Sequence, residues 1–127
     1  MIDQTNYTAG VCNIDSEGIR IRRRNGFISI GLGIIVIPLL FTFHIEPLFR
    51  FIIIGGFAAD AALNLLQAKE HFCVVNAMQG VYEVGMKRTK IGRSEAQATS
   101  DRKKMFRIYG MTIAIAIAAG SFGLLPL

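Results

Sequence analysis

Three long apolar segments dominate the hydrophobic pattern of this chain. Residues 25–43 and 108–127 carry no charged side chain, and residues 48–66 contain only Arg50 at one edge and Asp60 inside. A helix needs roughly 20 mostly apolar residues to cross the ~30 Å hydrocarbon layer of a bilayer. The pattern therefore predicts an all-α membrane protein. Its three transmembrane helices are expected at about 26–43, 48–68 and 106–125.

The polar segments outside these spans predict two further features. Asp15 or Ser16 can cap a helix, and the residues that follow are amphipathic at helical spacing. We therefore expect a short amphipathic N-terminal helix that leads into the first span. Residues 74–104 form a polar loop before the third span, in which the weak alternation of 81–84 is compatible with a short strand or an extended segment. No small-residue cleavage site follows the first apolar segment, so we expect no cleaved signal peptide and a single membrane domain over 1–127.

Basic residues flank the predicted spans unevenly. Four arginines precede the first span and eight basic residues lie between 87 and 107, whereas Arg50 is alone at the opposite end. By the positive-inside rule, the N-terminus and the loop are cytoplasmic and the C-terminus lies outside, in the cell (inner) membrane. This topology explains the net charge of +5, so we expect anionic lipid headgroups rather than nucleic acid as partners. The expected headgroup contacts are Arg20, Arg22, Arg23, Arg24, Lys103, Lys104 and Arg107.

Four polar residues follow one face of the second predicted span, because steps of four, three and four residues place them on one side of an uninterrupted helix. They are Asp60, Asn64, Gln67 and His71. A carboxylate inside a bilayer is costly and usually faces a bundle interior or water. No basic residue lies at comparable depth, so Asp60 is expected to be protonated, hydrated, bonded to a hydroxyl of another span, or paired with a second chain. The candidate hydroxyls are those of Ser29, Thr42, Thr112 and Ser121.

A second candidate site combines Cys12, His71 and Cys73 near the predicted inner surface. Thiolates and an imidazole suit zinc, copper or iron, and a thiol beside Lys69 and His71 could be reactive. The alternative is that Cys73 packs as a small apolar residue and His71 lies among the headgroups. Because no Cys-x-x-Cys pattern is present, we expect no cofactor, and a metal only as the weaker alternative.

Small residues recur on the predicted spans at spacings that allow close helix contact in lipid. Gly55 and Ala59 are four residues apart on the second span. On the third span the expected packing face consists of Gly110, Ala114 and Ala118, with Ala116 and Gly120 beside it. These faces exceed what three helices need among themselves, so we expect a homo-oligomer or a complex with other membrane subunits.

Several short motifs resemble those of small bacterial multi-pass membrane proteins that begin with a Cys-Asn-Ile sequence and an arginine run. The matching residues are Cys12-Asn13-Ile14, Arg20, Arg22, Arg23, Arg24, Gly26, Phe72-Cys73 and Gly80-Val81-Tyr82. A fainter similarity connects this chain with the membrane domain fused to some rhodaneses. The resemblance covers residues 12–82 and implies a two-helix core with an interfacial N-terminal segment. It implies no activity, apart from a hint of sulfur chemistry at Cys12 or Cys73.

No catalytic motif is apparent, so the chain is expected not to be an enzyme. The favoured interpretation is an accessory or structural subunit of a membrane assembly. One alternative is an oligomeric channel, or a proton or cation pathway, lined by Asp60, Asn64 and Gln67. A second alternative is a thiol- or metal-dependent protein at the cytoplasmic face of the membrane.

Overall fold

The computed structural model describes residues 10, 12–84, 87–90 and 92–126. In chain order the elements are α1 (Ser16–Thr42), α2 (Pro47–Glu70), α3 (Val74–Gln79), β1 (Val81–Val84), β2 (Lys87–Lys90) and α4 (Glu95–Phe122). Three of the described helices, α1, α2 and α4, are long and apolar enough to cross a membrane. The prediction of three such helices is therefore confirmed.

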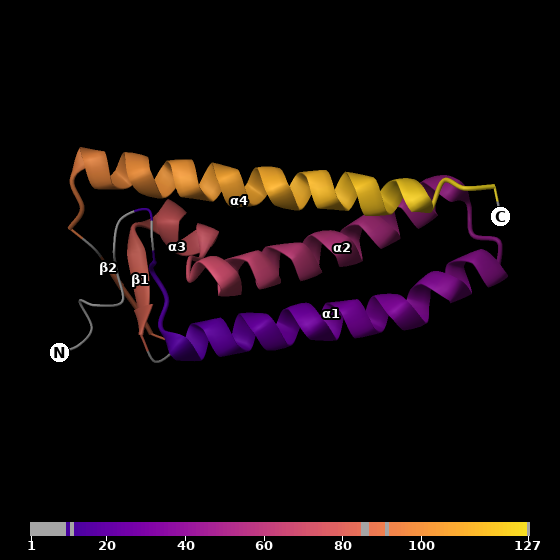
Figure 1. Cartoon of the computed structure of the whole chain (residues 1–127), viewed down its shortest axis with the longest axis horizontal. Coiled ribbons are helices and arrows are strands. Elements are labelled where there is room, and N and C mark those ends of the chain that lie inside the picture. The colour runs from indigo at the N-terminus through magenta and orange to yellow at the C-terminus, as the bar shows by residue number, and fades with distance from the viewer. Residues whose placement is uncertain (1–9, 11, 85–86, 91, 127) are drawn as a thin grey trace.

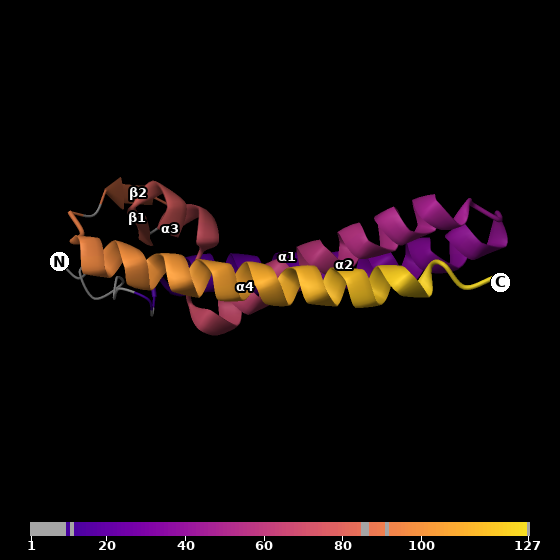
Figure 2. The ribbon, with the colours of Figure 1, turned by 90° about the horizontal axis from the view of Figure 1, so that it is seen from above.

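The helix α2 lies between α1 and α4 and packs against both (Figure 1). At one end of the three long helices, α3, β1 and β2 form a small group beside the start of α4; we call this end the head (Figures 1 and 2). The other end holds the α1–α2 turn and the end of α4, and we call it the hairpin end. There the rings of Phe41 and Phe122 meet edge to face, with centroids 5.6 Å apart.

The helix α1 is a single uninterrupted helix. The side chain of Asp15 caps it by accepting a hydrogen bond from the backbone N–H of Gly18. The expectation of a separate amphipathic helix before the first span is wrong, because residues 16–24 form the first turns of α1 itself. No proline interrupts this region, and extending an existing helix costs far less than nucleating a second one.

The helix α2 begins at Pro47 and ends at Glu70, where His71 adopts a left-handed conformation with φ 57°. The chain then turns, and Phe72 is fully buried in a small core with Val74 and Ile108. Burying this aromatic side chain under α4 offsets the cost of stopping the helix at His71.

The predicted polar loop contains regular secondary structure. It contains α3 and a two-stranded antiparallel sheet, in which Val81 lies opposite Lys90 and Val84 opposite Lys87. Residues 81–84 form the short strand β1, one of the two alternatives left open by the sequence, and both β1 and β2 are additions to the predicted all-α fold. The helix α4 begins about three turns before the predicted start of the third span. A capping box explains this early start: Ser94 accepts from the backbone of Gln97, whose side chain bonds back to Ser94.

Small residues set the distance between α2 and α4. A Cβ atom added at Gly120 would lie 2.9 Å from the carbonyl oxygen of Phe51, and one at Gly55 would lie 3.3 Å from that of Ala116. The prediction of close contact at Gly55, Ala116 and Gly120 is thus confirmed. The expected packing face at Gly110, Ala114 and Ala118 is wrong for contacts within this chain: nothing lies within 4 Å of Gly110, and both alanines are exposed. These two sets lie on different sides of α4, and only one side can face α2.

Candidate functional site

Asp60 lies on α2 at the surface of the described helices, and its side chain is exposed. The hydroxyl of Ser29, which is buried on α1, donates a hydrogen bond to the Asp60 carboxylate. Ser29 is one of the four hydroxyls expected from the sequence, and its hydrogen bond with Asp60 connects α1 to α2. A carboxyl group can form more than one hydrogen bond, and because the Asp60 side chain is exposed, it can also bond to a group outside the described helices.

A shallow groove of about 310 Å³ surrounds this carboxylate. It is lined by Ser29, Ile53, Gly56, Phe57 and Asp60. Nothing lies within 4 Å of the position that a Cβ atom of Gly56 would take, so the backbone of α2 is open to an approaching group there. The groove thus presents one polar pair within an apolar surface.

The contact with Ser29 also fixes the level of Asp60 along the helices. Ser29 comes five residues after Arg24 on α1, which corresponds to about 7.5 Å of helix rise. Asp60 therefore lies closer to the head than the midpoint of the apolar segment does. The sequence places Asp60 inside the second apolar segment, but only the pairing of α1 with α2 gives this level.

The four residues of the predicted polar face do not form one continuous polar strip. The Nδ2 atom of Asn64 donates to the backbone oxygen of Asp60, at 2.9 Å. Gln67 is buried, and its Oε1 atom accepts from the backbone N–H of Val74 at 2.9 Å. His71 lies beyond the last turn of α2 and is exposed. The periodicity assumed a helix that continues through His71, whereas α2 ends one residue earlier.

The Cys12, His71 and Cys73 set does not form a metal centre. In the described part of the chain, no group of three or more His, Cys, Asp or Glu side chains could hold a metal ion. Both cysteines are free thiols; Cys12 is half-buried and Cys73 is buried. The structure places Cys73 in the interior of the head, which agrees with its reading as a small apolar residue.

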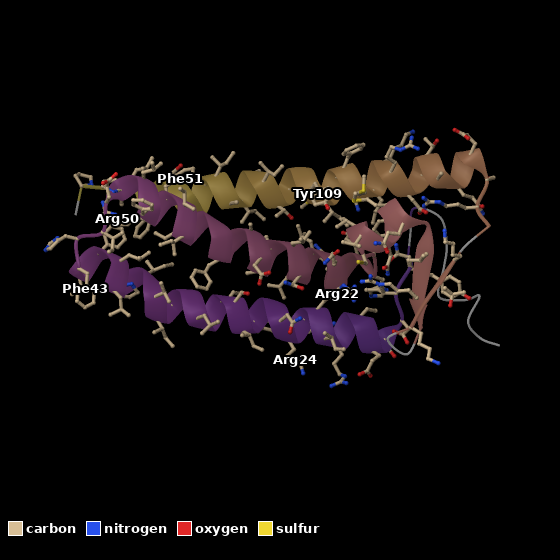
Figure 3. All side chains as sticks on the ribbon, turned by 180° about the vertical axis from the view of Figure 1, so that it is seen from behind. Arg22, Arg24, Phe43, Arg50, Phe51 and Tyr109 are labelled. Carbon is tan, nitrogen blue, oxygen red and sulfur yellow. The ribbon has the colours of Figure 1, made fainter. Side chains whose placement is uncertain are left out.

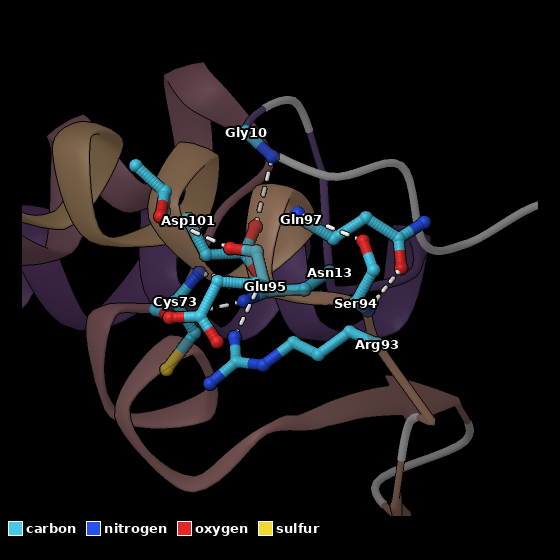
Figure 4. A network of polar contacts seen from close by, with 9 residues as sticks. Gly10, Asn13, Cys73, Arg93, Ser94, Glu95, Gln97 and Asp101 are labelled. Atoms are coloured by element: carbon cyan, nitrogen blue, oxygen red, sulfur yellow. Dashed lines mark hydrogen bonds and ion pairs between the residues drawn. The ribbon is translucent and has the colours of Figure 1, made fainter.

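The head contains a hydrogen-bond network that sequence reasoning missed (Figure 4). Asn13 is fully buried; its Nδ2 atom donates to the carbonyl of Cys73 at 3.0 Å, and its Oδ1 atom accepts from the Cys73 N–H at 2.7 Å. Asp101 is 1% exposed and accepts from Arg93 at 2.6 Å and from the backbone of Gly10 at 2.8 Å. The only signal for this network was the motif resemblance, since Cys12-Asn13-Ile14 and Phe72-Cys73 prove to contact each other.

Figure 3 shows Arg22 and Arg24 on the part of α1 nearer the head, whereas Arg50 lies at the hairpin end. Lys104 and Arg107 both donate to Glu70, at 2.6 and 2.7 Å. Glu70 lies just beyond the predicted second span. The hydrogen bond from Lys104 lowers the pKa of Glu70 below its ordinary value, although partial burial opposes this, and the charges of Lys104, Arg107 and Lys69 lower the pKa further.

Comparison with protein-family models, with curated proteins and with solved structures finds no match for this chain. The chain is therefore described by its own geometry, as a mostly helical protein with three helices long and apolar enough to cross a membrane. Its candidate site is the groove at Asp60 and Ser29, where a carboxylate opens outward from an apolar surface.

Proposed function

We propose that this chain is a non-catalytic membrane subunit that assembles with a second copy of itself through the groove at Asp60. The observation that carries the proposal is the outward-facing Asp60 carboxylate, which has one hydroxyl partner, Ser29, among the described residues. A carboxylate at this position costs free energy when it faces lipid, and a polar partner from another chain removes part of that cost.

The three apolar helices support a membrane location. In each of the three helices, only 17% to 28% of the most apolar 18-residue stretch is buried. Most of these helix surfaces are therefore left for lipid or for another chain. The basic residues at the head orient the chain with the head in the cytoplasm and the hairpin end outside. In this orientation Asp60 lies in the cytoplasmic half of the bilayer, about one and a half turns from Arg24.

A second copy is the favoured partner because one carboxyl group can pair with another. A protonated carboxyl group both donates and accepts a hydrogen bond, so two Asp60 side chains related by a twofold axis can bond to each other. Gly56 leaves the backbone of α2 accessible beside the carboxyl group, and small residues favour close helix approach in lipid.

The alternative of a proton or cation pathway has less support. Asn64 donates a hydrogen bond to the backbone of its own helix, and Gln67 accepts one from the backbone N–H of Val74 at the start of α3. Among the described residues of α2, Asp60, Asn64 and Gln67 therefore do not form a continuous row of polar side chains that could line a pathway. A thiol or metal function has less support as well, because Cys73 is buried.

Measuring the oligomeric state tests this proposal. The purified chain is reconstituted in vesicles with donor- and acceptor-labelled copies, and energy transfer is followed as lipid dilutes the protein. We expect wild type to associate and Asp60→Leu to associate roughly three- to thirtyfold more weakly, because interhelical polar contacts in lipid contribute about 0.6–2 kcal/mol. Asp60→Asn keeps both a donor and an acceptor, so it should retain most of the association.

Glu46→Gln is the matched control, because it removes an exposed carboxylate outside the groove and should associate like wild type. Circular dichroism checks that each variant stays helical. A monomeric wild type, or Asp60→Leu with unchanged association, would contradict the proposal. Proton or cation flux through wild-type vesicles that Asp60→Asn abolishes would favour the pathway instead.

A further inference from the structure

A second pocket, of about 370 Å³, lies at the head beside the first turns of α4. It is lined by Gly10, Ser100, Lys103, Lys104 and Arg107. Three of these five residues are cationic, and Ser100 adds a hydroxyl, whereas the backbone N–H of Gly10 already donates to Asp101. Groups of this kind are the usual ligands of a phosphate.

The positive charge of this pocket is only partly neutralised. Lys104 and Arg107 share the single carboxylate of Glu70. Lys103 is exposed and has no ion pair among the residues that the structure describes. Three cations around one anion leave a surplus of positive charge that favours an anionic ligand.

The face of α4 that carries this pocket continues as a smooth apolar surface. Steps of three or four residues place the following side chains on that same face: Ser100, Lys103, Arg107, Gly110, Ala114 and Ala118. The last three are small, both alanines are exposed, and a Cβ atom added at Gly110 would have no neighbour within 4 Å apart from the adjacent residues and the nearby backbone of α4. Larger exposed side chains, Phe106 and Met111, lie on either side of this face.

The polar and apolar parts of this face match the two parts of a phospholipid. We propose that this face binds one anionic phospholipid, with its phosphate in the pocket and an acyl chain along Gly110, Ala114 and Ala118. The pocket supplies charge where α4 changes from polar to apolar residues, and small side chains below it leave room for a chain between Phe106 and Met111. This site is on α4 and does not depend on the groove at Asp60.

Lipid binding to the full chain in detergent micelles tests this site, with native mass spectrometry to count bound lipids. We expect phosphatidylglycerol to bind wild type about tenfold more tightly than phosphatidylcholine, because each basic residue near an anionic headgroup favours binding several-fold. Lys103→Gln/Arg107→Gln should lose this preference. The matched control, Lys87→Gln/Lys90→Gln, removes the same charge from exposed positions on β2 and should keep it.

The apolar half of the site has its own test. Ala114→Leu fills the space proposed for the acyl chain, so it should weaken phosphatidylglycerol binding several-fold while leaving the pocket charges unchanged. Inorganic phosphate at millimolar concentration should not displace the lipid. Equal loss in the Lys87/Lys90 control, displacement by inorganic phosphate, or no preference in wild type would each overturn the proposal.

Discussion

The side chain of Asn13 forms a reciprocal pair of hydrogen bonds with the backbone of Cys73, as one strand does with its neighbour. Nδ2 donates to the Cys73 carbonyl at 3.0 Å, and Oδ1 accepts from the Cys73 N–H at 2.7 Å. The backbone N–H of Asn13 also donates to the carbonyl of His71, at 3.1 Å. Through these hydrogen bonds, Asn13 connects the segment before α1 to the turn between α2 and α3.

Asn13→Ala should destabilise the head, because it leaves the buried N–H of Cys73 without a partner, whereas the Cys73 carbonyl still accepts from the backbone N–H of Ala77 at 3.0 Å. An unsatisfied buried group costs about 1–3 kcal/mol, so we expect a loss of that size in the free energy of unfolding. Maleimide labelling of the buried Cys73 thiol should also become faster. Cys73→Ala is the control: it keeps both backbone groups and should be much milder. Unchanged labelling in Asn13→Ala would contradict this role.

Arg50 should stabilise the hairpin end, where α1, α2 and α4 meet. It is 3% exposed, and it donates through Nε to the carbonyl of Gly123 at 2.8 Å and through Nη2 to that of Leu125 at 2.9 Å. Its guanidinium lies 4.5 Å from the ring centroid of Phe41. These carbonyls lie at the C-terminal end of α4, where a cation is favoured.

Arg50→Met should therefore lower the free energy of unfolding by about 2–4 kcal/mol, since charged hydrogen bonds contribute about 1.5–3 kcal/mol each and their loss is not additive. Unfolding followed by circular dichroism in a denaturing-detergent titration gives this value. Arg24→Met, at an exposed position, is the matched control and should change stability little. Equal effects of the two substitutions would contradict a specific role for Arg50.

Two glycines on α4 provide a matched pair for testing helix packing. A Cβ atom at Gly120 would meet the backbone oxygen of Phe51 at 2.9 Å, whereas nothing lies within 4 Å of Gly110. Gly120→Ala should cost about 1–3 kcal/mol because the helices must separate. Gly110→Ala should be neutral or stabilise α4 by up to about 1 kcal/mol through helix propensity. The same denaturation experiment distinguishes them, and equal effects would mean that α2 and α4 do not pack closely at Gly120.

The long helices could be predicted because their signal is local: about 20 consecutive apolar residues are visible without knowledge of the partner. The structure of the head depends instead on contacts between distant residues. Asn13 and Cys73 are 60 residues apart, and Asp101 bonds to Gly10 across 91 residues. The helix α2 ends at Glu70, next to the buried Phe72, and the helical spacing of Asp60 and Asn64 does not predict this end.

The same distinction explains the outcome for the candidate sites. The Asp60 carboxylate was evident from its apolar neighbours, and Ser29 was among its predicted partners. The level of Asp60 along the helices could be determined only from the pairing of α1 with α2. The small residues of α4 were evident too, but the side that faces α2 depends on helix rotation, which spacing alone does not give.

The ion pairs of Glu70 predict how stability depends on pH. The pKa of Glu70 is lowered in the folded chain, chiefly by the hydrogen bond from Lys104, so the charged form is favoured by folding. Its contribution is fully present above the unfolded pKa, near 4.5, and is lost as the pH falls through the lower folded pKa. Glu70→Gln should therefore be less stable than wild type near neutral pH, and this difference should shrink as the pH is lowered from neutral to below 4.5. Chemical denaturation over this range measures the difference, and Glu46→Gln, at an exposed position outside this cluster, should show little pH dependence. A Glu70→Gln deficit that stays constant as the pH falls would mean that packing, and not the carboxylate charge, connects α2 to α4 at this position.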